Sequence, residues 1–304
     1  PTCALHLGNA RTFLVNWAMA RQAGWHIVLR IEDLDGPRVK SGVIDATIET
    51  LHWLGIEWDT GPIIQSQEPE AHVDAMRFLA THALVFPSDL SRAEIEAAAS
   101  APQEGTHEVR CPASMRPPLV PLDFADTGTN WRFATPEGVV RVEDEFAGPR
   151  EFTPSETIGD FIVWTRRGTP SYQLAVVVDD HRQGVTHVVR GDDLLESAAR
   201  QALLYRAMRY TPIPTYWHLP LVLGSDGRRL AKRHGDTRLE TYRARGVHAE
   251  RVIGLIAAWC GMVDSPTPMT PHEFQAALDV RRISSNAVMF TMEDDRWLLA
   301  DSRC

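Results

Sequence analysis

The chain has 304 residues, of which 44% are hydrophobic and 23% are charged, and its formal net charge is -9. This length suffices for one large or two modest globular domains, and no apolar run approaches the roughly 18 residues of a membrane span. The negative net charge argues against a broadly basic nucleic-acid-binding surface, although a local basic patch can still bind phosphate. The four cysteines form no close pair, which argues against a disulfide framework and favours a reducing cytoplasm: Cys3, Cys111, Cys260 and Cys304.

The first third of the chain alternates helical and strand patterns. Apolar residues at helical spacing from Ala10 onward predict a helix that ends at Gly24, and the almost continuous apolar run over 26–31 is typical of a central parallel strand. Helical patterns follow over 44–54 and 69–82, and a short strand pattern over 84–86. This alternation predicts an α/β protein with a doubly wound, Rossmann-like sheet.

Regular patterns stop at Pro87 and return after about Pro154, and the proline-rich, charged segment between them predicts an inserted subdomain. Further strands are predicted over 161–164, 174–178, 185–189 and 218–223, with a helix over 194–208 and more helices from about Leu239. We therefore expect four parts: the first half of the α/β domain (1–86), the insert (87–155), the second half (156–236) and a C-terminal helical region (237–304).

The segment His6-Leu7-Gly8-Asn9 opens the first predicted helix. The start of a helix presents unpaired backbone N–H groups and a partial positive charge, which attract phosphate. His6 can donate a hydrogen bond to a phosphoryl oxygen and favour the charge that develops during displacement at phosphorus. The alternative is that His6 caps the helix or packs at a strand end.

A cluster of cations follows the turn predicted over 224–227. Arg229, Lys232 and Arg233 project from this loop and can neutralise a triphosphate while its α-phosphorus is attacked. The alternative is a solvated basic turn. The pairing of this loop with His6 favours a nucleotide site built from both halves of the α/β domain.

Three further side chains stand at predicted strand ends, where doubly wound sheets bind their ligands. Glu32 can bind an ammonium group, although such an acid can also be a helix cap or an ion-pair partner. Arg190 can hold a carboxylate with its fork of donors, and Tyr172 adds a phenol, so the three predict an amino acid with an acidic side chain as ligand. The run Asp179–His181 resembles a metal site, but adjacent strand residues point to opposite faces, so we expect a structural role for it.

Five segments resemble the class I glutamyl-tRNA synthetases in order and spacing: Pro1–Asn9, Leu29–Asp35, Val177–His181, Val188–Gly191 and Arg229–Arg233. The resemblance covers most of the chain and is weakest in the insert. It implies a Rossmann-like catalytic domain that activates glutamate with ATP and Mg²⁺. It implies that His6 and Lys232 are catalytic, that ATP binds at His6, Gly8, Asn9, Arg229 and Lys232, and that glutamate binds at Glu32, Tyr172 and Arg190.

Within that family the chain is most similar to a shortened branch that lacks the anticodon-binding region. Val176 and Leu194 stand where the longer enzymes commonly carry Asn and Trp near the amino-acid pocket, and the insert keeps the outline of 86–92 followed by His107 and Cys111. Members of the branch attach glutamate to the queuosine base of tRNA(Asp). The resemblance therefore implies this tRNA as partner, a cytoplasmic monomer and no membrane contact.

The zinc-binding positions of that branch are degenerate in this chain. A Cys-x-Cys pair and a Tyr-x-x-x-Cys segment hold zinc there, and the corresponding residues are Ser88, Leu90, His107 and Cys111. Two possible ligands do not complete a tetrahedral site, so we predict no bound zinc.

We expect a two-step ligase in which glutamate attacks the α-phosphorus of Mg-ATP and the adenylate passes glutamate to a tRNA hydroxyl. Three alternatives remain. Departures from the family pattern at Cys3 and Ala231 leave open a degenerate paralogue that binds RNA or a partner protein without turnover. A glutamyl-tRNA synthetase truncated at its C-terminus would share these motifs, and a small-molecule nucleotidyltransferase would share His6 but would need no amino-acid pocket at Arg190.

Overall fold

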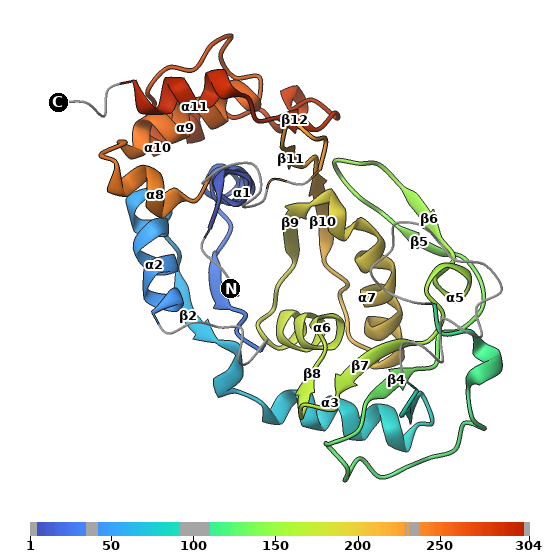
Figure 1. Cartoon of the computed structure of the whole chain (residues 1–304). Coiled ribbons are helices and arrows are strands. Elements are labelled where there is room, and N and C mark those ends of the chain that lie inside the picture. The colour runs from blue at the N-terminus through green and yellow to red at the C-terminus, as the bar shows by residue number, and fades with distance from the viewer. Residues whose placement is uncertain (1–4, 35–41, 91–109, 229, 231–236, 301–304) are drawn as a thin grey trace. The chain divides into compact units, whose positions relative to one another are not determined.

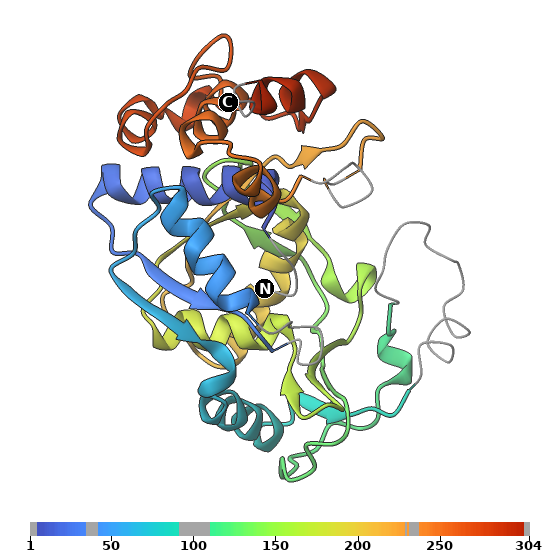
Figure 2. The same ribbon diagram turned by 60° about the vertical axis from the view of Figure 1, so that its left-hand side comes forward.

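The structure is a computed structural model that describes residues 5–34, 42–90, 110–228, 230 and 237–300. The chain is drawn in Figure 1 and, turned by 60°, in Figure 2. It forms two compact units. The first comprises the residues up to Gln67, Val189–Asp193 and the residues from Trp217 on, and the second comprises Glu68–Val188 and Leu194–Tyr216. The four-part division expected from the sequence remains a prediction.

The first unit combines helices with short pairs of strands. Its elements are α1 (Leu7–Ala23), β1 (Val28–Ile31), α2 (Val43–Trp53), β2 (Thr60–Ile64), η2 (Gln65–Gln67), the carboxyl-terminal parts of β9 (His187–Gly191) and β10 (Thr215–Leu219), β11 (Val222–Leu223), α8 (Leu239–Ala244), α9 (Ala249–Trp259), α10 (Pro271–Ala277), η6 (Val280–Arg282), β12 (Val288–Met289) and α11 (Met292–Leu299). Strands β1 and β2 are parallel neighbours, as are β11 and β12, and β9 pairs with β10.

Helix α1 confirms the first predicted helix. Leu7, Leu14 and Ala18 on its apolar face are fully buried, and α1 packs against α9 and α10. The helix stops at Gly24, whose φ of +67° costs a glycine little and whose N–H donates to the Ala20 carbonyl. The predicted helices over 44–54 and 69–82 are also confirmed.

The second unit is built around an antiparallel sheet of strand order β3-β4-β7-β8. Its elements are α3 (Glu70–Thr81), β3 (Val85–Pro87), η3 (Ala113–Met115), β4 (Trp131–Phe133), β5 (Val140–Val142), β6 (Arg150–Phe152), α5 (Pro154–Thr157), β7 (Phe161–Thr165), β8 (Thr169–Pro170), α6 (Tyr172–Arg182), η4 (Asp192–Leu194, at the border of the units) and α7 (Leu195–Ala207). Helix α6 packs on α3, α7 and β7, and α7 packs on β5.

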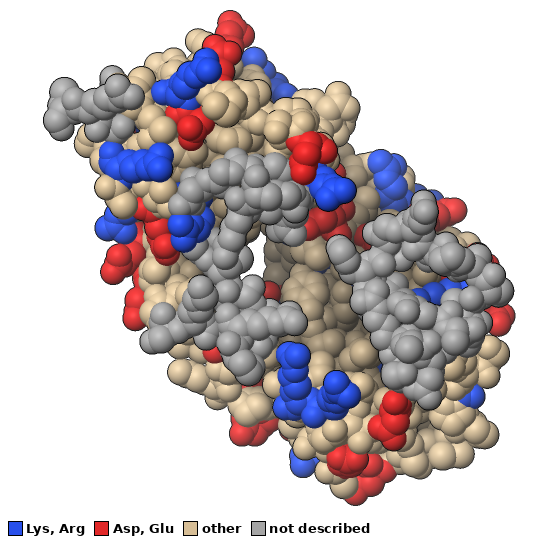
Figure 3. All heavy atoms as spheres, in the orientation of Figure 1, with Lys and Arg blue, Asp and Glu red and all other residues tan. Residues whose placement is uncertain are grey.

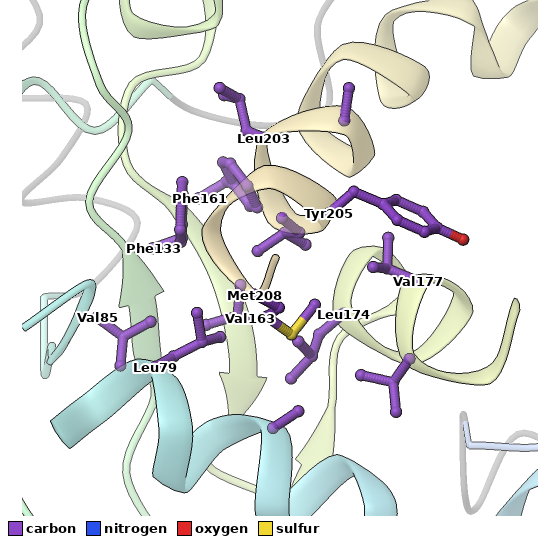
Figure 4. Close-up of a cluster of buried hydrophobic side chains, with 14 of the residues drawn as sticks. Leu79, Val85, Phe133, Phe161, Val163, Leu174, Val177, Leu203, Tyr205 and Met208 are labelled. Atoms are coloured by element: carbon purple, nitrogen blue, oxygen red, sulfur yellow. The ribbon is translucent and has the colours of Figure 1, made fainter. Parts of the chain in front are cut away.

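The core of the second unit lies between these helices and the sheet. Figure 4 shows Leu79 from α3, Phe133 and Phe161 from the sheet, Leu174 from α6 and Leu203 from α7 directed into one cluster. The rings of Phe133 and Phe161 lie 5.3 Å apart. Removing a large apolar side chain from such a packed interior typically costs about 2–5 kcal/mol, so this cluster is what holds the sheet and helices of the unit together.

The strand predicted over 174–178 is wrong, because these residues lie within helix α6. Every residue from Gln173 to Asp180 is buried. A helix covered on several sides loses its polar stripe, so a short apolar run cannot be distinguished from a buried strand by periodicity. Tyr172 consequently stands at a helix start and not at a strand end.

The single strand predicted over 218–223 is also wrong, because two strands occupy this region. β10 ends at Leu219 and β11 begins at Val222. The intervening Pro220 has no N–H to donate to a sheet, which favours a break at this point. The predicted strand over 84–86 is confirmed as β3, which pairs antiparallel with β4.

A buried ion pair connects the insert to the sheet of the second unit. The Nε and Nη2 groups of Arg116 donate to the two carboxylate oxygens of Asp160, at 2.8 and 2.5 Å, and Asp160 is 1% exposed. The Thr135 amide also donates to Asp160 Oδ1, and Arg132 Nη1 donates to the Asp160 carbonyl. The hydrogen bonds that Arg116 itself donates to the Asp160 carboxylate raise the pKa of the Arg116 guanidinium. A buried carboxylate with this many donors is stabilising only while the set is complete.

The described residues at the degenerate zinc positions do not fit a zinc site. Ser88 Oγ accepts a hydrogen bond from Arg132 Nε at 3.3 Å, which places a cation beside it, and Leu90 has no donor atom. Burial raises the pKa of the Cys111 thiol, which disfavours the thiolate that zinc requires. His107 lies outside the described residues. That the protein binds no zinc therefore stays a prediction, which metal analysis of the purified protein can test.

Two surface properties limit what the molecule can contact. Within the described part of the chain, no helix has the length and apolar character needed to cross a membrane. On the face drawn in Figure 3, acidic and basic side chains are interspersed over the described surface. A polyanion would therefore be bound through local basic contacts on this face and not by a uniform positive field.

We predict that Asp160→Asn lowers the free energy of unfolding by about 3 kcal/mol, because it leaves the Arg116 guanidinium without its buried counter-charge. Urea titration followed by tryptophan fluorescence measures the change. The matched control is Glu143→Gln, whose pair with Arg141 has side chains 65% and 59% exposed. That variant should stay within about 0.5 kcal/mol of the wild type. Equal effects of the two substitutions would contradict the role given to Asp160.

We predict that the purified protein contains no stoichiometric zinc and that a chelator leaves its melting temperature unchanged. The physical reason is that Ser88, Leu90, His107 and Cys111 offer too few ligands for a tetrahedral zinc site. Metal analysis by mass spectrometry, combined with thermal melts with and without EDTA, checks both points. One zinc per chain together with a lowered melting temperature in EDTA would refute the prediction.

Candidate active site

The sequence at the start of α1 folds into a capped helix terminus. His6 is the N-cap residue: its Nδ1 accepts from the Gly8 amide at 3.1 Å, and its own amide donates to Asn9 Oδ1 at 3.1 Å. This is the capping role that the sequence left as an alternative for His6. With Nδ1 as acceptor, the neutral ring carries its proton on Nε2.

Gly8 is required by the close approach of the His6 ring. A Cβ atom at position 8 would lie 3.1 Å from both Cε1 and Nδ1 of that ring and 3.6 Å from Val222 Cβ. A side chain at this position would require the ring to shift by a few tenths of an ångström. The glycine of the motif therefore allows the His6 ring to lie at the helix start. The side chain of Asn9 takes part in the cap, where its Oδ1 accepts from the His6 amide.

Arg11, one turn further along α1, was not singled out from the sequence. It is 1% exposed, and its Nη1 donates to the Pro220 carbonyl at 2.5 Å, in the bend after β10. Burial raises the pKa of the Cys260 thiol at the end of α9, and Arg11 beside that thiol partly opposes the shift. Arg11 thus joins α1, the β10–β11 bend and α9. An arginine on the apolar face of a predicted helix was the signal that could have found it.

Two acids at the carboxyl end of β1 have different roles. Glu32 Oε1 accepts from Arg30 Nη2 at 3.1 Å, and the Glu32 side chain is 41% exposed. Its other oxygen, Oε2, has no partner among the described residues and can accept from an ammonium group. Asp33 binds the Ser66 amide and hydroxyl at 2.8 and 2.6 Å. Both carboxylate oxygens of Asp33 are engaged by Ser66, whereas only Oε1 of Glu32 is engaged by Arg30.

Arg190 lies at the carboxyl end of β9, as predicted, and is 9% exposed. Its Nε donates to Nε2 of His218 on β10 at 2.9 Å, and His218 is fully buried. Two acids follow along the chain: partial desolvation and the adjacent Asp193 carboxylate raise the pKa of Asp192, while His218 and Arg11 lower it. The end of β9 therefore combines a cation with two carboxylates.

Tyr172 belongs to the second unit, where it is the first residue of α6 and is 40% exposed. Buried side-chain amides connect the start of this helix to α7. Gln173 Nε2 donates to Ser197 Oγ at 3.0 Å, and Gln201 Nε2 donates to Gln173 Oε1 at 3.0 Å. This network anchors the first turn of α6 to α7.

Asp179 and His181, from the run 179–181, each contact other side chains of the second unit. Asp179 lies 3.2 Å from His72 Nε2 and accepts from Arg182 Nε at 2.9 Å, and both Asp179 and His72 are fully buried. His181 stacks on Tyr210, with ring centroids 3.8 Å apart. Within the described ranges, no group of three or more His, Cys, Asp or Glu side chains has the arrangement needed to hold a metal ion.

The structure places His6, Gly8, Glu32 and Arg190 in the first unit, and Tyr172 in the second. The turn predicted over 224–227 is confirmed, because the Gly227 amide donates to the Gly224 carbonyl at 3.0 Å. Arg229, Lys232 and Arg233 lie outside the described residues. His218 was missed because a lone histidine in an apolar strand gives no signal of its partner.

The family model described as tRNA synthetases class I (E and Q), catalytic domain, matches residues 1–297 of this chain. Two relatives named glutamyl-Q tRNA(Asp) synthetase are among the similar proteins. The one from Symbiobacterium thermophilum is 44% identical over 306 residues, which cover 96% of this chain and 94% of the relative. The one from Rhodopirellula baltica is 42% identical and covers 86% of this chain and 83% of the relative.

Longer relatives and a solved structure agree with this assignment. The glutamate–tRNA ligase 1 of Alkalilimnicola ehrlichii is 35% identical, with 98% of this chain and 63% of the relative covered. A crystal structure of a glutamate tRNA ligase from Elizabethkingia meningosepticum, in complex with its amino acid, has a TM-score of 0.78 at 25% identity and covers 98% of this chain and 67% of that chain. The chain therefore belongs to the class I aminoacyl-tRNA synthetases of the glutamate and glutamine (E and Q) family, whose fold is the mixed α/β catalytic domain described above.

Proposed function

We propose that this chain activates L-glutamate with Mg-ATP and transfers the glutamate to the queuosine base of tRNA(Asp). One observation carries the proposal. The start of α1, which attracts phosphate, is tied through Arg11 to Pro220, two residues after His218, and His218 binds Arg190. A phosphate-binding element and a carboxylate-binding cation therefore lie along one connected path in a single unit.

The names of the relatives point to two possible acceptors of glutamate in the second step, the queuosine base and the 3′ end of tRNA. The two highest identities reported above, 44% and 42%, are with relatives named glutamyl-Q tRNA(Asp) synthetase, against 35% for the glutamate–tRNA ligase. Val176, one turn after Tyr172 on α6, is 7% exposed and apolar where the longer enzymes commonly carry Asn. These features favour the modified base over the 3′ end of tRNA as acceptor.

Each proposed residue has a task that matches its environment. In the first step a carboxylate oxygen of glutamate bonds to the α-phosphorus and the bond to the leaving pyrophosphate breaks. His6 Nε2–H and Lys232 stabilise the charge on the phosphates, Gly8 lets the ring of His6 lie at the helix start, and Mg²⁺ enters bound to ATP. Glu32 binds the ammonium group of glutamate, while Arg190 and Tyr172 select its acidic side chain. In the second step a tRNA hydroxyl bonds to the carbonyl carbon, with loss of its proton, and AMP leaves.

The deciding experiment has two stages. Pyrophosphate exchange should depend on glutamate and not on tRNA, because no acceptor is needed to form the adenylate. Labelled glutamate supplied with ATP and queuosine-containing tRNA(Asp) should then appear on the modified base. Label at the 3′ end would favour the glutamate–tRNA ligase activity, and ATP binding without any exchange would favour a non-catalytic RNA-binding paralogue.

We predict that Glu32→Gln raises the KM for glutamate about 10-fold or more and leaves the KM for ATP unchanged, because a neutral amide replaces a charged acceptor for the ammonium group. Pyrophosphate-exchange kinetics measure both constants. Glu49→Gln is the control, since its side chain is 67% exposed in a surface pair with Arg243. An unaltered glutamate KM in Glu32→Gln would remove Glu32 from the pocket.

We predict that Lys232→Ala raises the activation free energy of adenylate formation by about 2 kcal/mol or more and so slows this step. The substitution deletes a cation that meets the developing charge on the phosphates. Lys40 and Lys232 are the only lysines of the chain, so Lys40→Ala is a matched control. Single-turnover adenylate formation gives the rate. A rate in Lys232→Ala equal to that of the control would exclude the lysine from the mechanism.

A further inference from the structure

We infer that Gln173 is a positioning residue for the glutamate pocket, because its buried amide ties the start of α6 to the start of α7. The inference rests on the proposed function, in which Tyr172 selects the acidic side chain of glutamate. Gln173 follows Tyr172 in the first turn of α6 and is 9% exposed. The residues that carry the inference all belong to the second unit.

Both ends of the Gln173 amide are bound by one face of α7. Its Nε2 donates to Ser197 Oγ at 3.0 Å, and its Oε1 accepts from Gln201 Nε2 at 3.0 Å. Ser197 and Gln201 are four residues apart in α7, so they lie on the same face of that helix, one turn apart. Arg200 Nη2 also donates to Ser197 Oγ, at 3.1 Å. The amide of Gln173 is therefore fixed at both of its ends by a single turn of α7.

The first turn of α6 needs such a connection, because its N-cap residue does not supply one. Within the described residues, Ser171 makes no capping hydrogen bond through its side chain, and its buried Oγ has no hydrogen-bond partner. The backbone of the turn is closed by the Ala175 amide, which donates to the Ser171 carbonyl at 2.9 Å. A hydrogen bond is directional, whereas apolar contacts between two helices allow small rotations and shifts. The Gln173 amide thus sets the orientation of this turn against α7.

The two helix starts that Gln173 joins carry the residues assigned to the amino-acid pocket. Successive residues of a helix are rotated by about 100° around its axis, so fixing Gln173 also fixes the direction in which Tyr172 leaves α6. Val176 lies one turn after Tyr172, on the same face. Leu194 lies three residues before Ser197, at the entry to α7. Val176 and Leu194 stand where the longer enzymes commonly carry pocket residues. The buried amide therefore sets how the groups proposed to select glutamate are placed relative to one another.

The role in positioning can be separated from a role in stability. Replacing both partners of a buried hydrogen bond by apolar groups of the same shape is nearly neutral for the free energy of unfolding. Such a replacement preserves packing but supplies no directional bond. A double substitution of Gln173 and Gln201 should therefore leave the protein folded while it loosens the first turn of α6.

The kinetic experiment uses the double variant Gln173→Met/Gln201→Met, which replaces both amides by unbranched apolar side chains. We expect the KM for glutamate in pyrophosphate exchange to rise about 10-fold or more, with kcat and the KM for ATP within about two-fold of the wild type. Gln173→Glu keeps one oxygen as acceptor for Gln201 and one for the Ser197 hydroxyl, and should keep this KM within about five-fold of the wild type.

The control is Thr135→Val, which removes another buried hydrogen bond of the second unit, from Thr135 Oγ1 to the Gly159 carbonyl at 2.7 Å. It should leave the KM for glutamate within about two-fold of the wild type. Urea unfolding shows whether each variant is folded.

Hydrogen exchange followed by NMR gives a readout that does not depend on activity. The Ala175 amide should exchange about 10-fold or more faster in the double variant than in the wild type, because it closes the turn that Gln173 holds. The buried amides of α3 serve as an internal reference and should exchange at unchanged rates. Unchanged exchange at Ala175 would overturn the inference whatever the kinetics show.

The outcomes distinguish this inference from the proposed function. A wild type without glutamate-dependent pyrophosphate exchange would defeat the proposed function, and the Ala175 amide alone would then judge whether Gln173 holds the turn. With an active wild type, an unchanged glutamate KM in the double variant would overturn the inference alone. An equal rise of this KM in Gln173→Glu or in Thr135→Val would also overturn it.

Discussion

One buried guanidinium, that of Arg11, constrains the arrangement of the first unit. A cation removed from water is costly unless polar groups compensate it, so Arg11 must stay against the Pro220 carbonyl and beside Cys260. These contacts hold α1 to the bend after β10 and to the end of α9. The N-terminal turn with His6 and Gly8 is part of the same helix, and His218 lies just before the bend. Arg11 therefore connects the helix that begins at the proposed phosphate-binding group to the bend that follows the strand of His218.

Arg116 and Arg190 have hydrogen-bond partners of different kinds. Arg116 is paired with a fully satisfied carboxylate, Asp160, and the pair has no charge left for a ligand. Arg190 Nε donates to Nε2 of His218, a ring nitrogen and not a carboxylate. Two neighbouring acids that follow β1 also differ: both oxygens of Asp33 are engaged by Ser66, whereas Glu32 accepts from Arg30 through Oε1. Binding capacity follows from what the local partners leave unsatisfied.

Capping and catalysis are compatible at His6, because they use different nitrogens of one ring. Nδ1 closes the first turn of α1, and this fixes both the tautomer and the ring orientation. A helix N-terminus that is already capped still presents its dipole and further N–H groups to an anion. In this family assignment, the alternative interpretation of His6 describes how the proposed catalytic group is held in place, and Gly8 is the residue that makes room for it.

The sequence by itself determined the features that depend on local spacing. Apolar periodicity predicted α1, α2, α3 and α9, and Gly24 marked a helix end because glycine adopts the left-handed backbone there at little cost. The family motifs predicted the site residues, of which His6 and Arg190 lie where a helix starts and a strand ends. Local spacing failed at α6, since burial on several sides removed the polar stripe that identifies a helix. The pairing of Arg190 with His218, 28 residues apart, was decided only by the tertiary structure, because strand pairing and not chain distance brings their side chains together.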